Sequence, residues 1–426
     1  MIVSPLKYSK LLALPIICVS TFAQAQTSWQ TDGSYRLRYE TLNNAYRANA
    51  NGSDQILASQ LLFSIKAKHE NLLAQLEIQD SRTWLDDAGT PLGTDDVNAL
   101  EPLQLWLGWQ ISPDSLVKVG RQTLDIGSRR LMARQRFRNT ISAYDGAYAR
   151  FQQNDWLLQS FYFMPVERHP ESRADLDDNK IKLDKQGDDK FWGVHLSQNS
   201  ANTNPVEFYY YGLDKSESDL SISTLGIRYI QPNAVNHWDY EIEAAYQFGD
   251  NQSLDVKAGL LHAHLGYSLA DSLSSRLEFM FDYASGDDDP NDGKDNRFNT
   301  LSGVSRFDFG PTGIYGAFSR ANIVSPGVKW GFKPDSTQTV FVAYRAVWLD
   351  SETDSQARSG LRDTTGQSGT FAGHQLESRW RYKLNKAVQL ELGGTYLVKG
   401  EFLQDAPNSP QDKDTAYFYS QFSYQF

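Results

Sequence analysis

The sequence predicts an all-β fold: a transmembrane antiparallel β-barrel of about 18 strands, with short periplasmic turns and long extracellular loops. Three observations predict this fold. The chain begins with an export signal, alternating strand-like segments recur along its whole length, and the connections between them are short and long in turn.

Residues 1–25 have the pattern of a secretory signal peptide. Lys7 and Lys10 form a positive n-region, a short apolar run follows, and small residues at positions 23 and 25 provide a cleavage site. The apolar run is too short to cross a bilayer as a helix. We therefore expect residues 26–426 to form the mature protein, a single outer-membrane barrel domain.

Strand-like segments of alternating character follow throughout this mature region. Examples are SYRLRYE (34–40), LLAQLEIQ (72–79), LQLWLGWQ (103–110) and TVFVAYRAVWL (339–349). Successive side chains of a strand point to opposite faces, so each segment has an apolar face and a polar face. The basic residues that the alternation places on the polar face, and hence predicts in the lumen, are Arg36, Arg38, Lys66, Lys68, Arg150 and Arg345.

The connections between these segments form two sets. One set is short, as at 111–115, 152–155 and 333–337, whereas the alternate set is mostly long, as at 122–143 and 286–320. Outer-membrane barrels show this asymmetry, with both termini on the short-turn side.

The chain ends in DTAYFYSQFSYQF, with Phe418, Phe422, Tyr424 and Phe426 on one face of a strand. We interpret this segment as the lipid-facing strand that closes the barrel. Its terminal Phe426 resembles the signal that the barrel-assembly machinery reads.

Charge and cysteine content exclude several classes of protein. Removal of the signal peptide leaves 39 basic and 52 acidic residues, a net charge of −13, which argues against general nucleic-acid binding. The one cysteine, Cys18, lies in the predicted signal peptide, so no disulfide is expected in the mature protein. We find no motif for a cofactor.

One segment departs from the acidic balance. Residues 121–138 read RQTLDIGSRRLMARQRFR, with a single acid, Asp125, and six arginines: Arg121, Arg129, Arg130, Arg134, Arg136 and Arg138. Guanidinium groups stay charged and bind carboxylates and phosphates bidentately, so the segment is a candidate anion-selecting element of the lumen. The alternative is a solvated loop that pairs with lipopolysaccharide phosphates or with nearby acidic loops.

Other candidate chemistry is weaker. Five aspartates between 287 and 295 could hold Ca²⁺, but their spacing does not match an EF-hand, which favours a solvated acidic loop. His262 and His264 share a strand face without a visible third ligand, so we predict no metal site. The sequence contains no Gly-x-Ser-x-Gly or His-Glu-x-x-His motif, and we do not expect an enzyme.

Four segments resemble the outer-membrane alginate-export porins. They are an Arg-rich stretch after a Gly-Arg-Gln strand end (119–151), a Ser-Gly-Asp loop (283–301) and two late strand pairs (322–349 and 373–402). The resemblance covers nearly the whole mature chain. It implies an 18-stranded monomeric barrel whose basic lumen conducts a polyuronate, with Arg121 and the Arg129–Arg138 cluster in the selectivity region.

The expected function is therefore a passive channel in the bacterial outer membrane for anionic solutes, such as an acidic oligo- or polysaccharide like alginate. The alternatives are a general or small-solute uptake porin with another cargo, an outer-membrane enzyme, and a purely structural barrel. Expected partners are outer-membrane lipid, lipopolysaccharide and the anionic saccharide itself. The net charge of −13 fits a polyanion poorly, although much of the acid lies in loops.

Overall fold

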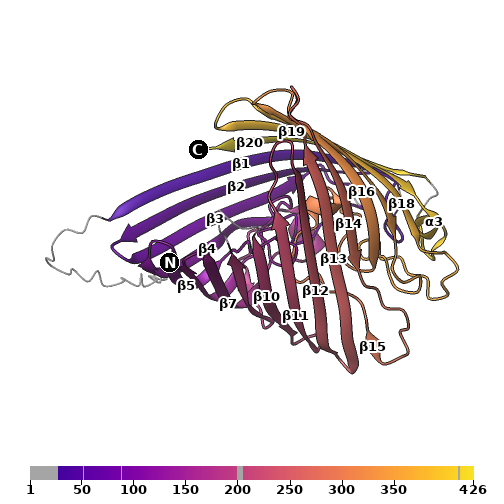
Figure 1. The fold of residues 1–426 in the computed structure, drawn as a ribbon, viewed down its shortest axis with the longest axis horizontal. Helices are drawn as coiled ribbons and strands as arrows, with labels where there is room; N and C mark the ends of the chain where they lie inside the picture. The colour runs from indigo at the N-terminus through magenta and orange to yellow at the C-terminus, as the bar shows by residue number, and fades with distance from the viewer. Residues whose placement is uncertain (1–26, 51, 88, 199–204, 411–412) are drawn as a thin grey trace, which may run out of the picture.

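A computed structural model describes residues 27–426 except 51, 88, 199–204 and 411–412, so the predicted signal peptide lies outside the described residues. Eighteen antiparallel strands, each hydrogen-bonded to two neighbours, form a closed barrel, as predicted. The last strand pairs with the first along ten residues, from Ser34 opposite Gln425 to Asn43 opposite Ala416 (Figure 1). Closure leaves no free strand edge, which a bilayer requires.

The barrel strands of the first half are β1 (Ser28–Asn43), β2 (Asp54–His69), β3 (Leu72–Trp84), β4 (Asn98–Ser112), β5 (Ser115–Gln122), β6 (Tyr144–Gln153), β7 (Trp156–Glu167), β9 (Lys190–Gln198) and β10 (Val206–Lys215). Those of the second half are β11 (Leu220–Gln231), β12 (Trp238–Asn251), β13 (Leu254–Ser268), β14 (Arg276–Ala284), β16 (Ile323–Phe332), β17 (Gln338–Trp348), β18 (Phe371–Lys383), β19 (Val388–Lys399) and β20 (Thr415–Gln425). The loops add the two-residue strands β8 (Lys185–Gln186) and β15 (Lys294–Asp295) and the helices α1 (Arg173–Asp177), α2 (Arg306–Phe309) and α3 (Glu401–Asp405). Among the described residues, no helix combines the length and apolar character needed to cross a bilayer.

The predicted alternation separates an outer face from an interior face. Leu105 and Leu107 are 60% and 63% exposed on the outside of β4, whereas Gln104, on the interior face of the same strand, is buried. In β20, Phe418 and Phe422 face outward and Tyr419 is fully buried. The closing strand therefore presents its aromatic face outward, as the sequence predicts.

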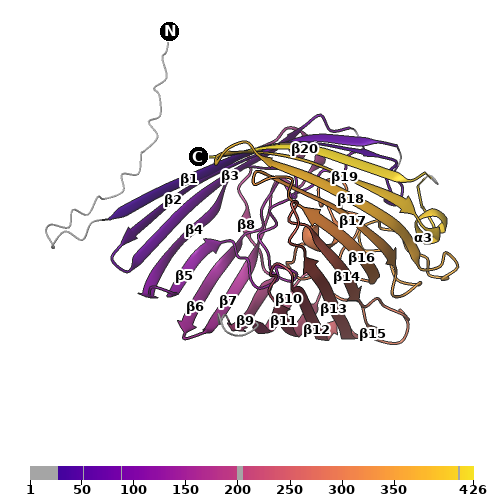
Figure 2. The ribbon, with the colours of Figure 1, turned by 45° about the horizontal axis from the view of Figure 1, so that its top comes forward.

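The two rims of the barrel differ. Phe426 and the first residues of β1 lie at one rim, where β2–β3, β4–β5 and β6–β7 are joined by two-residue turns. We call this the terminal rim. The opposite, long-loop rim carries the connections 123–143, 285–322 and 349–370, although two of its connections, 216–219 and 252–253, are also short. Figure 2 shows chain from the long connections passing through the ring of strands.

Much of the buried core lies inside this ring rather than between sheets. Aromatic residues on the inner faces of β6, β7, β9 and β10 cluster with apolar residues of the connections that enter the barrel. The interior is thus partly filled by packed chain, and that chain defines the candidate site.

Candidate functional site

Two connections from the long-loop rim fold into the barrel and meet there. Residues 123–143 join β5 to β6, and residues 285–322 join β14 to β16 and contain α2. Met132 and Ser302 form a parallel β-bridge, and the Ser302 amide donates to the Leu131 carbonyl at 3.0 Å. We call these two joined segments the inserted layer.

Apolar residues between the arginines explain why the first segment enters the barrel. They would be exposed in a solvated loop, but inside the barrel they join the aromatic core, which removes their apolar surface from water. These buried residues are Leu124, Ile126, Leu131 and Met132, and their cluster includes Phe161, Phe163 and Tyr209 of the wall. The segment is therefore folded into the lumen by its apolar residues.

Arg130 fixes both halves of the inserted layer to the wall. Its guanidinium pairs with Glu241 and with Glu243 (2.7 Å) of β12, and its Nε lies 3.1 Å from Asp308 of α2. Burial alone would lower the pKa of Arg130, but these three carboxylates raise it well above its usual value. The guanidinium of Arg130 is therefore fully ion-paired inside the protein.

Arg134 and Arg138 are also paired. Arg134 forms a bidentate pair with Glu77 of β3, at 2.7 and 3.0 Å, and Arg138 lies 2.7 Å from Asp95. Burial lowers the pKa of Arg138 more than Asp95 raises it. These arginines position the segment more than they offer free charge.

Arg36 and Arg38 of β1 hold the inserted layer from the opposite wall. Arg36 donates to the carbonyls of Arg136 (2.5 Å) and Arg138 (2.7 Å), and Arg38 donates to the carbonyl of Phe137 (2.7 Å). Arg38 also pairs with Glu40 at 2.6 Å, whereas Arg36 has no acidic partner within the described chain.

Helix α2 is anchored by a second buried charge group. Asp308 pairs with Arg320 as well as with Arg130, and these arginines hold its pKa well below the usual value although burial would raise it. His262 Nδ1 lies in a hydrogen bond with the carboxylate of Asp282 at 2.7 Å. The same carboxylate pairs with Arg345 of β17 at 2.7 Å.

His262, Asp282 and Asp308 are the one group of the described residues close enough to share a metal ion, their ligand atoms lying within 4.8 Å of one another. The sequence does not indicate the two aspartates as partners of this histidine. Because arginines already neutralise both carboxylates, the group suits an ion-pair network better than a cation. His264, the other histidine of the predicted pair, contacts Asp239 instead at 3.5 Å.

A cavity of about 230 Å³ lies between the inserted layer and the wall formed by β1 and β18–β20; we call it the arginine chamber. Its lining includes six arginines and two acids: Arg36, Arg129, Arg136, Arg306, Arg379, Arg381, Asp125 and Glu391. Three of the six are paired, Arg136 with Asp125 (2.8 Å), Arg306 with Glu377 (2.7 Å) and Arg381 with Glu391 (2.7 Å).

The other three guanidinium groups of the chamber, Arg36, Arg129 and Arg379, have no ion pair with any described residue. Arg129 lies over the ring of Phe307 at 4.1 Å and Arg379 over that of Phe341 at 4.7 Å. The chamber thus combines uncompensated positive charge with aromatic walls. A carboxylate or phosphate that enters the chamber would find bidentate donors in Arg129 and Arg379 without displacing an acidic partner, whereas the terminal nitrogens of Arg36 already donate to backbone carbonyls.

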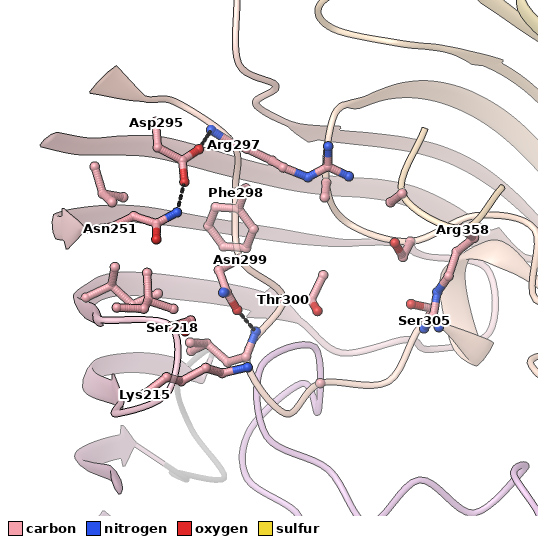
Figure 3. A pocket seen from close by; sticks show the side chains of 18 of the residues that line it. Lys215, Ser218, Asn251, Asp295, Arg297, Phe298, Asn299, Thr300, Ser305 and Arg358 are labelled. Carbon is pink, nitrogen blue, oxygen red and sulfur yellow. Dashed lines mark hydrogen bonds between the residues drawn. The ribbon is translucent and has the colours of Figure 1, made fainter. Parts of the chain in front are cut away.

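A larger cavity of about 590 Å³ opens on the long-loop side of the same layer; we call it the vestibule (Figure 3). Lys215, Arg297 and Arg358 reach it from β10 and from two different loops. Gln135 of the inserted layer lines both the vestibule and the arginine chamber. The layer is therefore the partition between the two cavities.

The structure places most of the predicted basic residues inside the barrel. Arg129, Arg130, Arg134, Arg136 and Arg138 belong to the inserted layer, and Arg36, Arg38, Arg150 and Arg345 lie on interior strand faces. Lys66 and Lys68 share the interior face of β2 but lie near the terminal rim, where Lys66 pairs with Asp32 at 3.1 Å. Their role in selecting a solute stays a prediction.

Arg121 is different, and its predicted place in the lumen is wrong. It shares a face of β5 with Val119, which is 62% exposed on the outside, whereas Gln122 beside it is buried toward the interior. Arg121 pairs there with Glu101 (2.6 Å) and Asp145 (2.9 Å). It is in the strand rather than the loop, so strand alternation, not arginine density, decides its direction.

Several chamber residues were not among the predicted ones. Arg379 and Arg381 alternate in ESRWRYK of β18, so the rule that identified Arg36 and Arg38 would have identified them too. Arg306 and Phe307 belong to a four-residue helix within a long loop, and no sequence signal brings that helix to β18.

Comparisons with known proteins agree with this architecture. Among solved structures, Pseudomonas aeruginosa OccK11 (OpdR) is 13% identical with a TM-score of 0.59, covering 93% of this chain and 96% of that one. Acinetobacter baumannii OccAB1 is 11% identical with a TM-score of 0.61 over 93% and 96% of the two chains. Pseudomonas aeruginosa OccK2 (OpdF), in complex with glucuronate, is 12% identical with a TM-score of 0.61 over 93% and 98%. At such identities the likeness concerns the fold.

A search of curated proteins gives no match. The family model described as alginate export matches residues 28–416, from the first strand to the beginning of the last. A match of that extent includes the inserted layer and every barrel strand at least in part. The chain therefore belongs to the alginate export family.

Proposed function

We propose that the protein is a passive channel of the bacterial outer membrane for anionic solutes, with acidic oligo- or polysaccharide such as alginate as the favoured cargo. Membership of the alginate export family and the porin-like barrel support a channel rather than an enzyme or a structural barrel. On this view the terminal rim faces the periplasm and the long-loop rim the exterior.

The observation that carries the anionic cargo is the arginine chamber. Arg36, Arg129 and Arg379 keep three positive charges there without an ion pair to any residue that the structure describes. Such charge raises the local concentration of anions and repels cations. The paired arginines around it can exchange partners with a passing carboxylate, which gives binding strong enough to enter and weak enough to leave.

A second candidate is a porin for small anionic solutes, and the size of the chamber favours it. A cavity of about 230 Å³ accommodates a monosaccharide acid more readily than a polymer. The complex of the structurally similar OccK2 with glucuronate supports a uronate as such a solute. Movement of the inserted layer would be needed for longer chains.

The test is the reversal potential of the refolded protein in a planar bilayer across a KCl gradient. We expect anion selectivity in the wild type and a shift toward cation selectivity in the double variant Arg129→Gln/Arg379→Gln. These two positions are chosen because Arg130 and Arg134 are ion-paired, so their removal would leave buried carboxylates. Arg362→Gln, in an exposed loop position, is the control and should leave the potential unchanged.

A cation-selective wild type, or a double variant identical to the wild type, would contradict the proposal. Block by glucuronate but not by a uronate trimer would favour the small-solute porin. We also propose, from the sequence, that Phe426 is read by the barrel-assembly machinery and that the barrel is monomeric among lipid and lipopolysaccharide.

A further inference from the structure

The vestibule differs from the arginine chamber in what lines it. Beside its charged groups it presents neutral hydrogen-bonding side chains from four parts of the chain: Gln135, Ser218, Asn251, Asn299, Thr300, Ser305 and Ser319. The chamber instead has Phe137, Phe307 and Val304 around its arginines. Hydroxyl and amide groups suit a hydroxylated ligand, whereas aromatic and aliphatic walls do not satisfy several hydroxyls at once.

The charge of the vestibule is unbalanced. Arg138, Lys215, Arg297 and Arg358 line it together with a single carboxylate, Asp295. Arg138 pairs with Asp95 at 2.7 Å, a carboxylate that also pairs with Arg168 at 2.6 Å, and Arg297 pairs with Asp354 at 2.6 Å. Asp295 accepts a hydrogen bond from the Asn251 side chain at 2.8 Å.

The two remaining cations of the vestibule are Lys215 and Arg358. Neither charged end has a hydrogen bond or ion pair with a residue that the structure describes, and both side chains are half-buried against the cavity. They come from the end of β10 and from the connection 349–370, and Figure 3 shows them reaching the cavity from separate chain segments. A half-buried cation without a partner is ready to accept an anionic ligand.

We propose that the vestibule is a second, separate binding site for a hydroxylated oligoanion, a short acidic oligosaccharide whose negative groups contact Lys215 and Arg358. Its volume of about 590 Å³ is in the range of pockets that enclose a ligand of several rings, unlike the chamber of about 230 Å³. This inference rests on the proposed function but concerns a site that anion selectivity does not require.

The position of the site makes its binding one-sided. The inserted layer, in which the buried Gln135 lines both cavities, separates the vestibule from the chamber. An oligoanion reaches Lys215 and Arg358 directly from the long-loop rim, whereas from the terminal rim it must first move the inserted layer aside. Occupancy of the vestibule should therefore depend on the side of addition, whereas occupancy of the chamber by a small anion should not.

The test combines binding and channel block with trigalacturonate as the probe and neutral maltotriose as its uncharged counterpart. Calorimetry of the detergent-solubilised wild-type barrel should show binding of trigalacturonate but not of maltotriose. Lys215→Gln and Arg358→Gln should each weaken binding about tenfold or more, because each removes one charge-assisted hydrogen bond. In a planar bilayer, trigalacturonate should block the current from the long-loop side only.

Two variants serve as controls. Lys294→Gln removes an exposed lysine of the same rim, which pairs with Asp292 outside the cavity, and should leave the affinity unchanged. Arg129→Gln/Arg379→Gln changes the chamber and should alter ion selectivity while trigalacturonate still binds.

Equal affinity in the wild type and in Lys215→Gln/Arg358→Gln would overturn the inference, as would equal block from both sides. If the probe does not bind to an anion-selective wild type, the vestibule site is refuted and the proposed function stands. If the wild type binds the probe as expected but is cation-selective, the proposed function fails and the vestibule site stands.

Discussion

Replacement of Arg130 by Met should loosen the inserted layer without opening the barrel wall. Arg130 is the residue that connects both halves of the layer to β12, because it contacts Glu241, Glu243 and Asp308 at once. Methionine retains part of the apolar stem but none of the charge. The variant therefore leaves three buried carboxylates with one partner fewer.

The free-energy cost of this substitution depends on the partners that each carboxylate retains. Breaking a buried ion pair from one side typically costs about 3–5 kcal/mol. Each acid retains one other partner, so the lower limit of about 3 kcal/mol applies. The partners that remain are Arg228 for Glu241, Tyr209 for Glu243 and Arg320 for Asp308. A change of about 3 kcal/mol shifts the balance between seated and displaced layer roughly 150-fold.

Single-channel recording and hydrogen exchange together measure this shift. We expect a larger and noisier conductance and faster amide exchange in residues 123–143, with heat-modifiable migration on SDS gels retained because the strand pairs are intact. Arg276→Met is the matched control, since Arg276 pairs with Asp239 and Glu278 between wall strands and does not touch the layer. Unchanged conductance and exchange in Arg130→Met would refute the reasoning.

Three further outcomes are expected. Gly303→Ala should also raise conductance, because a Cβ at this position would lie 1.6 Å from the Arg130 carbonyl oxygen and would separate the two halves of the layer; a conductance equal to wild type would contradict this. Burial raises the pKa of Asp96 to about 7, so the folded protein retains a proton that the unfolded chain releases near pH 4. Its contribution to stability is full below about pH 4 and is lost as the pH rises through about 7. Hydrogen exchange of its loop, referenced to Asp96→Asn, should show this trend. Gly33→Val should slow refolding to the heat-modifiable form, because a Cβ there would meet the Phe426 ring at 2.4 Å where the first and last strands join.

The barrel could be predicted in detail because its determinants are local in the chain. Alternation in segments such as that around Leu105 and Leu107 sets the two faces of each strand, and connection length sets the two rims. The alternation from Phe418 to Phe426 indicated a strand, and the export signal at the other end of the chain identified it as the closing strand of a barrel. The same rule places Arg121 outside, and the error arose from treating a strand residue as part of the arginine-rich loop.

The site could be predicted only in part. Arginine density indicated residues 129–138 as a candidate lumen element, but it could not distinguish Arg129, which has no ion pair with a described residue, from Arg130, which three carboxylates neutralise. Those carboxylates lie more than a hundred residues away in the sequence. Pairing depends on which distant acids the fold brings near, and a count of charges does not contain that information.

The sequence by itself determined the class of fold, the faces of the strands and the two rims, since periodicity and turn length act over a few residues. The tertiary structure alone decided that the loops 123–143 and 285–322 join inside the barrel, that they divide the lumen into vestibule and chamber, and which cations remain unpaired. The physical reason is that closing the barrel brings residues far apart in the chain within bonding distance. The closed barrel therefore decides which charges neutralise one another and which face the solute.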